Sequence, residues 1–150
     1  MKMLGFGNMF FAALVASTVP ALLFVFLGFI LEPNNGWATI AAVVAFLFSF
    51  FSILFLGIPC TLILNKFNSL NWLSILAAGF FIAFALSILL NTVFSASGIN
   101  YSSESNGEWI VLNGVTTAAG WKSHALGAIY SGILGIVVSG IFFSVLRKNK

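Results

Sequence analysis

Few side chains in this sequence can do acid–base, nucleophilic or metal chemistry. The 150 residues include one histidine, one cysteine and three glutamates, and no aspartate. They are His124, Cys60, Glu32, Glu104 and Glu108. A zinc site takes three or four close ligands, and a serine nucleophile needs an adjacent base. No second histidine, cysteine or carboxylate lies near His124 in the sequence. We therefore assign no catalytic, cofactor-binding or metal-binding residue and expect His124 to be an interfacial side chain.

The same inventory disfavours several known classes of membrane protein. Four-span multidrug exporters of the small multidrug resistance type exchange protons through a carboxylate in the middle of a span, and no glutamate here lies inside one. The G-x-S-x-G elbow and the glycine-rich nucleotide loops are absent from the sequence, and a single cysteine excludes a dithiol mechanism. The terminal RKNK directly follows an apolar run, so we expect it to contact anionic lipid rather than nucleic acid.

The composition indicates a membrane protein. Hydrophobic residues make up 61% of the chain and charged residues 6%, whereas a soluble domain carries about 25% charged residues. Four uncharged runs cover residues 10–31, 37–64, 72–94 and 125–146. Each exceeds the roughly 20 residues with which a helix crosses the hydrocarbon layer, and backbone groups in lipid must pair within their own segment. The sequence predicts an all-α membrane protein, a four-helix bundle forming one integral membrane domain over residues 1–150.

Prolines interrupt two of the runs. Pro20 predicts a bend in the first run, because proline removes a backbone donor and crowds the preceding turn. Gly57 and Pro59 predict a kink in the second run, or the end of its straight part near the cytoplasm. Cys60 lies beside them, and we expect a buried thiol there rather than an acylation site. The first run is too long for a secretory signal, whose apolar region covers only about 7–15 residues.

The basic residues predict the orientation in the membrane. Five of the six fall at the two termini and in the connection between the second and third runs: Lys2, Lys66, Arg147, Lys148 and Lys150. Lys122 and the three glutamates fall in the other two connections. Basic residues accumulate on the cytoplasmic side, so both termini are predicted to be cytoplasmic. Trp37, Trp72 and Trp121 lie at the ends of spans, where indole rings favour the membrane interface.

The long outer connection, residues 95–121, carries signals for a small sheet. Asn-Gly pairs occur at 106–107 and at Asn113-Gly114, and Asn-Gly between strand-forming residues is the strongest short hairpin signal. The second turn would pair Leu112 with Val115 and place Thr117 opposite Ile110. The first turn would extend the hairpin to three strands by pairing Ser103 with Ile110. One face would then carry four apolar side chains, those of Tyr101, Ile110, Leu112 and Val115. A flexible Ser/Gly-rich loop is the alternative.

Small or polar residues recur every four positions in the last two runs. They are Gly79, Ala83, Ser87 and Asn91 in the third run, and Gly127, Ser131, Gly135 and Ser139 in the fourth. Membrane helices associate through close backbone approach at small residues. We therefore predict a packing seam between these two helices, with a seam to another copy as the alternative. Asn91 is expected to hydrogen-bond across helices, and a substrate role is its alternative.

Three features resemble small four-span inner-membrane proteins of Gram-negative bacteria. They are GIPCTLILNKFNSLNWLSILAAGFFIA over residues 57–83, NGVTTAAGW over 113–121 and the glycine-rich last run ending at Arg147. The resemblance covers about the last two-thirds of the chain and implies a bacterial inner membrane, with no catalytic residues to carry over. We expect a non-enzymatic inner-membrane protein, an accessory or envelope component, whose partners are membrane lipid and either itself or another membrane protein. A small channel or carrier for a neutral or lipophilic solute, lined by Ser and Asn, is the alternative.

Overall fold

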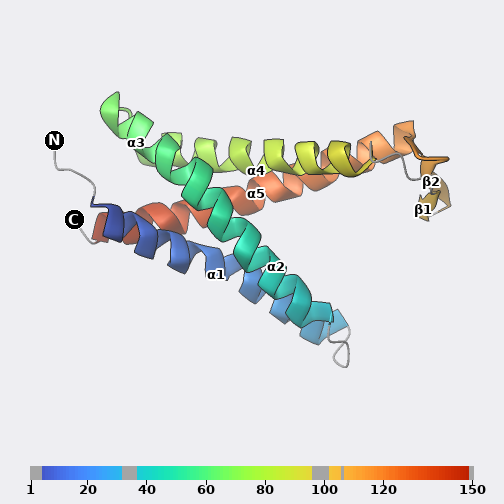
Figure 1. Cartoon of the computed structure of the whole chain (residues 1–150), viewed down its shortest axis with the longest axis horizontal. Helices are drawn as coiled ribbons and strands as arrows, with labels where there is room; N and C mark the ends of the chain where they lie inside the picture. Colours follow the sequence, from blue (N-terminus) through green and yellow to red (C-terminus); the bar gives the residue numbers. More distant parts are fainter. Residues whose placement is uncertain (1–4, 32–36, 96–101, 106, 149–150) are drawn as a thin grey trace. The chain divides into compact units, whose positions relative to one another are not determined.

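A computed structural model describes residues 5–31, 37–95, 102–105 and 107–148. The helices are α1 (Phe6–Leu31), α2 (Trp37–Ser52), α3 (Ile58–Lys66), α4 (Trp72–Ser95) and α5 (Ala118–Lys148), with a π-helical turn η1 (Ile53–Gly57) between α2 and α3 (Figure 1). Three short strands, β1 (Ser103–Ser105), β2 (Glu108–Leu112) and β3 (Val115–Thr116), lie between α4 and α5 in the sequence. Glu32, Tyr101 and Asn106 lie outside the described residues.

Four helical stretches are long and apolar enough to cross a membrane. They are Phe6–Gly28, Ala38–Lys66, Trp72–Val93 and Ala118–Lys148. The first three agree with the predicted runs to within about one helical turn. The helix that contains the fourth run, α5, begins at Ala118, seven residues before that run starts at residue 125. The run was bounded by charge, and Lys122 lies just before it. A helix can extend past a charged residue, so the helix and the uncharged run need not start together. The predicted outer segment, residues 95–121, therefore includes the first turn of α5, and its bounds stay a prediction.

Two compact units make up the chain: residues 1–79 together with 136–150, and residues 80–135. Both α4 and α5 contribute to each unit. The prediction of one integral membrane domain over residues 1–150 stays a prediction.

In the first unit, α1 packs along α2. On α1 the buried residues are Met9, Ala12, Ala13, Ala16, Ser17 and Pro20. Further along, a methyl group added at Gly28 would overlap the Ala38 side chain and lie 3.4 Å from the Ala38 Cα atom. The two backbones therefore approach closely where neither has a bulky side chain, as membrane helices require for tight packing. The packing residues predicted from the sequence lay only in the last two runs and did not include Gly28.

The second span changes its helical register before Pro59. The Ile58 N–H donates to the Ile53 carbonyl, five residues back, and Pro59 lies in the first turn of α3 with Gly57 as N-cap. Proline has no N–H and its ring crowds the carbonyl four residues earlier, so a wider turn just before it relieves that crowding. The interruption lies where Gly57 and Pro59 predict it, but it takes the form of a π-helical turn, and α2, η1 and α3 follow one another as a continuous rod (Figure 1). At Pro20, α1 remains helical on both sides.

The connection from α3 to α4 is closed by local hydrogen bonds. Asn68 has a positive φ of 55°, and the Ser69 N–H donates to the Leu64 carbonyl at 2.9 Å, which is the pattern of a Schellman helix end. The next helix then starts with a reciprocal cap. The Asn71 side chain accepts the Ser74 N–H at 2.8 Å, and the Ser74 hydroxyl accepts the Asn71 N–H at 3.1 Å. This turn needs no partner from elsewhere in the chain.

Candidate functional site

The three-stranded sheet formed by β1, β2 and β3 lies on the start of α5 and is joined to it by hydrogen bonds and close contacts. Its strands form one antiparallel sheet in the order β1-β2-β3, which confirms the predicted small sheet between the third and fourth membrane-length helices. Leu112 pairs with Val115 across the Asn113-Gly114 turn, as predicted. Asn113 and Gly114 have φ angles of 50° and 78°, and two positive φ angles in succession are the requirement of a type I′ turn. The Asn113 N–H also donates to Ser102 Oγ at 3.1 Å.

A β-bulge alters the pairing of β1. Glu104 pairs with Trp109, but Ser103 pairs with Val111, so Ile110 is passed over. The predicted pair of Ser103 with Ile110 is therefore wrong. The extra residue in β2 increases the local twist and bends the strand. Turn chemistry specifies the residues next to the turn, and it carries no information about a bulge further along.

The predicted apolar face of this sheet is also wrong about which side chains become buried. Val111 is the buried residue of β2, at 3% exposure, while Leu112 and Val115 are 44% and 69% exposed. Val111 pairs with Thr116, and the Thr116 methyl group lies against Gly120 of α5. The face carrying Val111 and Thr116 is thus the one that meets the helix, and the Leu112–Val115 pair remains on the outside.

Thr117 joins the sheet to α5. Its N–H donates to the Ile110 carbonyl at 3.0 Å, and its hydroxyl donates to the carbonyls of Trp109 and Ile110. The same hydroxyl oxygen accepts the Gly120 N–H at 3.1 Å, and the Thr117 carbonyl accepts the Trp121 N–H at 2.9 Å. Thr117 is therefore both the N-cap of α5, satisfying one of its free N–H groups, and the last residue bonded to β2.

Gly120 allows the helix to touch the strand. A methyl group added there would overlap the Ile110 carbonyl oxygen and lie 2.7 Å from the Thr116 methyl carbon. Contacts between real side-chain atoms are usually 3.4–4 Å, so only glycine fits against this backbone. The sequence signal was the string NGVTTAAG, in which a hairpin turn, a capping threonine and a glycine follow within eight residues. Sequence reasoning recognised the turn but not the junction.

His124 lies one turn further along α5. Its ring packs edge-on against Trp121, with ring centroids 5.8 Å apart. Its Nδ1 atom is shielded from solvent and has no hydrogen-bond partner among the described residues. Within the same residues, no group of three or more His, Cys, Asp or Glu side chains is placed to hold a metal ion. The residues at the start of α5 therefore present an aromatic and apolar surface.

The residues of the predicted packing seam differ in how deeply they are buried. Gly127 is exposed, and a methyl group added there meets nothing within 4 Å. Its neighbour Ala128 is buried at 0% exposure. Gly132 is also buried, and a methyl group there would come 2.5 Å from the Phe80 ring. The close approach of α4 and α5 in this unit therefore uses Gly132, which was not in the predicted row.

The remaining seam residues are half-buried: Gly79, Ala83, Ser87, Asn91, Ser131, Gly135 and Ser139. The full row, whether within the chain or to another copy, stays a prediction.

Several polar side chains in the spans donate to backbone carbonyls of their own helices. Asn91 donates to the Ser87 carbonyl at 2.9 Å, so its partner is one turn back and not on another helix as predicted. The hydroxyl groups that behave in this way are those of Ser17, Thr18, Ser52, Thr61, Thr92, Ser139 and Ser144. This local bonding satisfies each donor inside an apolar environment without a polar partner on a neighbouring helix.

In comparisons with known proteins, the chain matches no protein-family model, no curated protein and no solved structure. The resemblance to small inner-membrane proteins therefore stays an expectation based on the residues quoted for it.

Proposed function

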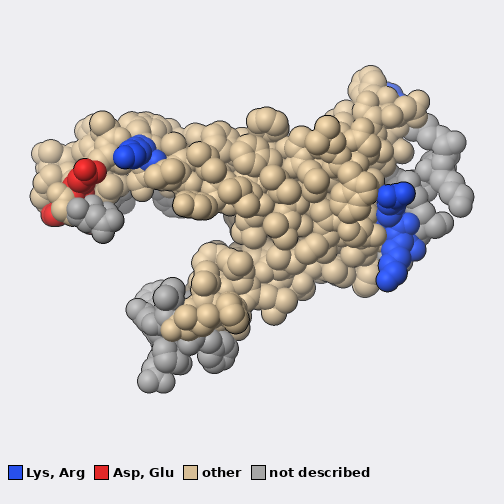
Figure 2. Space-filling model, turned by 180° about the vertical axis from the view of Figure 1, so that it is seen from behind, with Lys and Arg blue, Asp and Glu red and all other residues tan. Residues whose placement is uncertain are grey.

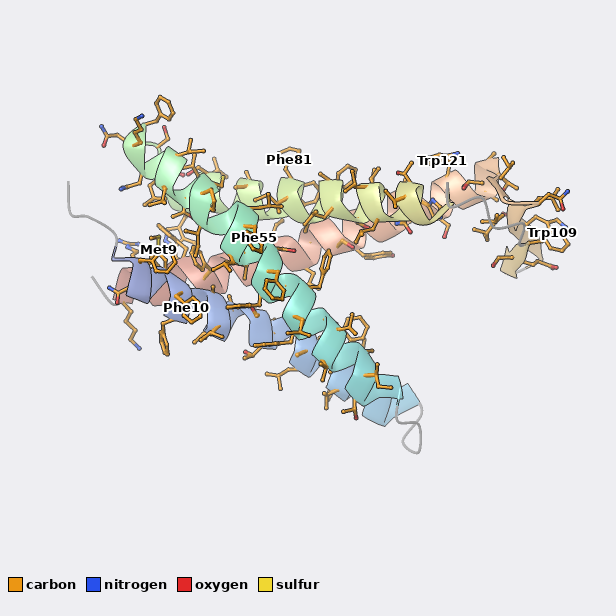
Figure 3. The ribbon with its side chains drawn as sticks, in the orientation of Figure 1. Met9, Phe10, Phe55, Phe81, Trp109 and Trp121 are labelled. Atoms are coloured by element: carbon orange, nitrogen blue, oxygen red, sulfur yellow. The ribbon has the colours of Figure 1, made fainter. Side chains whose placement is uncertain are left out.

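We propose that this protein is a non-enzymatic component of a bacterial inner membrane and acts through contacts with lipid and with protein. The observation that supports the proposal most is the apolar surface of the helices. Large side chains such as Phe55 and Phe81 are 67% and 65% exposed, and Phe81 points away from α4 (Figure 3). Lipid tails or another apolar protein surface must cover such side chains, because water does so only at a high cost.

The second and third spans make this point most clearly. In their most apolar windows only 6% of the residues are buried by the chain itself, against 28% in the first and fourth spans. A protein that worked alone as a packed bundle would bury more of each helix. The second and third spans therefore have the most surface available for lipid or for a partner, which is either a second copy or another membrane protein.

The placement of charge supports an orientation with both termini in the cytoplasm. Lys66 ends α3, and Arg147 and Lys148 end α5. The acidic side chains of Glu104 and Glu108 lie on the outer sheet, in the same unit as Lys122 (Figure 2). Basic residues accumulate on the cytoplasmic side of spans, so we assign the sheet to the outer face.

Cysteine labelling tests this orientation. Single cysteines at Ser103 and at Asn149, in a Cys60→Ala background, are treated with a membrane-impermeant maleimide in intact cells. We expect the reagent to label the cysteine at 103 and to label the cysteine at 149 only after the membrane is opened. Labelling at 149 in intact cells would contradict the assignment.

A flux assay separates the contact function from transport. The purified protein is reconstituted into lipid vesicles, and the entry of a small neutral solute such as glycerol is followed by light scattering. The local bonding of the span hydroxyls leads us to expect the same rate as in protein-free vesicles. A faster, protein-dependent rate that a mid-span substitution such as Ser87→Leu abolishes would favour a channel or carrier.

A further inference from the structure

The outer sheet leaves three large apolar side chains exposed. Trp109, Leu112 and Val115 are 48%, 44% and 69% exposed, and Trp109 stands on the sheet away from the helix end marked by Trp121 (Figure 3). Leu112 and Val115 are direct partners across the hairpin, so their side chains share one face. A segment that served only as a soluble tether would be expected to carry polar side chains at these positions.

The length of α5 indicates the depth at which this sheet lies. The helix has 31 residues and is therefore about 46 Å long at about 1.5 Å per residue, while the hydrocarbon layer is about 30 Å thick. Roughly ten residues of α5 must lie outside the hydrocarbon. The charges mark which ones, because Lys122 stands near the first end and Arg147 and Lys148 at the last. The first turn of α5 is thus in the headgroup layer.

The sheet cannot move far from that level. Its β2 strand touches Gly120 in the first turn of α5 and is bonded to Thr117, the residue just before Ala118. Gly120 is five residues, or about 8 Å, before the start of the uncharged run at Ala125. That distance is comparable with the thickness of one headgroup layer. Apolar side chains on a sheet held at this height meet lipid headgroups and the upper parts of acyl chains.

We propose that the outer sheet is a lipid-contact surface, with Trp109, Leu112 and Val115 inserted in the headgroup layer of zwitterionic phospholipid. Indole rings prefer this layer, where the ring is buried and the N–H remains hydrated. Two exposed carboxylates on the same sheet, Glu104 and Glu108, oppose an anionic lipid surface. The inference rests on the proposal that α5 spans a membrane, and it goes further by making the outer segment part of the membrane-bound surface.

Trp109 is itself the probe for this proposal. Trp37, Trp72 and Trp121 are replaced by Phe, and the protein is reconstituted into phosphatidylcholine vesicles with bromine atoms placed either near the headgroups or deep in the acyl chains. We expect Trp109 emission at shorter wavelength than in the denatured chain, and stronger quenching by the shallow bromines than by the deep ones. The double variant Leu112→Asp/Val115→Asp should reduce this quenching, while Ser103→Asp should leave it unchanged.

Two results would overturn the proposal. Emission at long wavelength, quenched by aqueous iodide and not by brominated lipid, would place the sheet in water. Emission at short wavelength that neither reagent quenches would mean that another protein surface covers Trp109.

A tryptophan at position 133, in a chain whose four native tryptophans are replaced by Phe, separates this outcome from failure of the membrane assignment. Ile133 is 50% exposed in the middle of α5. Quenching there by deep bromines, with none at Trp109, would reject the lipid-contact surface alone. Emission at long wavelength from position 133, quenched by aqueous iodide and not by brominated lipid, would reject the spanning of α5 itself.

Discussion

Replacing Gly120 by alanine should detach the three-stranded sheet from α5. The new methyl group would overlap the Ile110 carbonyl oxygen and lie 2.7 Å from the Thr116 methyl carbon, where ordinary contacts begin at 3.4 Å. The strand must therefore move away by at least about 0.7 Å. Such a shift lengthens the bond from the Thr117 N–H to the Ile110 carbonyl from 3.0 Å to beyond hydrogen-bonding distance.

The free-energy change can be worked out from these contacts. Loss of the two Thr117 bonds to the Ile110 carbonyl costs about 1–3 kcal/mol, since each contributes about 0.5–1.5 kcal/mol net. The substitution recovers up to about 1 kcal/mol, because alanine favours a helix over glycine. From a central loss of about 2 kcal/mol, a recovery of about 0.5 kcal/mol leaves a net loss of about 1.5 kcal/mol. Because about 1.4 kcal/mol corresponds to a tenfold change in an equilibrium, opening of the sheet should become about tenfold more frequent.

Hydrogen exchange measures this opening directly. Amides of β2 and β3, residues 108–116, should exchange about tenfold faster in Gly120→Ala than in the unmodified protein, while amides in the middle of α5 should not change. Gly127→Ala is the matched control, since it places the same methyl group on the same helix where nothing lies within 4 Å. Equal exchange in both variants would refute the reasoning and show that helix and strand do not touch at Gly120.

Three further substitutions test the packing and the cap. Gly28→Ala should weaken the pairing of α1 with α2 by about 1–3 kcal/mol, as overpacking does, when the protein is unfolded by sodium dodecyl sulfate. Gly7→Ala is the control and should have no effect, because nothing lies within 4 Å of a methyl group there. Equal unfolding curves for the two variants would contradict the close approach. Gly132→Ala should also lower stability in that assay, because the aromatic ring that it faces must rotate, and an unchanged midpoint would show that the ring moves freely. Thr117→Val should accelerate hydrogen exchange in the first turn of α5, because loss of an N-cap costs about 1 kcal/mol. Thr117→Ser keeps the hydroxyl and should retain the protection from exchange. A serine variant that exchanges as fast as the valine variant would assign the effect to packing.

Much of the architecture could be predicted from the sequence because it depends on local composition. The four membrane-length helices follow from runs without charge, since the thickness of the bilayer and the need to pair backbone groups act on each segment separately. The hairpin at Asn113-Gly114 is local as well, because the positive φ angles of its turn are a property of those two residues. The pairing of Leu112 with Val115 follows directly from that turn.

Contacts between segments decided the rest. The bulge that pairs Ser103 with Val111, and the choice of Val111 over Leu112 as the buried side chain, depend on which face of the sheet meets α5. The roles of Gly120, Gly132 and Gly28 likewise depend on which other segment packs against each glycine. A glycine is needed only where another chain segment comes within reach of its missing methyl group, as at Gly120 but not at Gly127. The packing of elements distant in the sequence sets which segment that is. Composition and spacing determined where the helices and the turn lie, and tertiary structure alone determined which small residues allow these elements to touch.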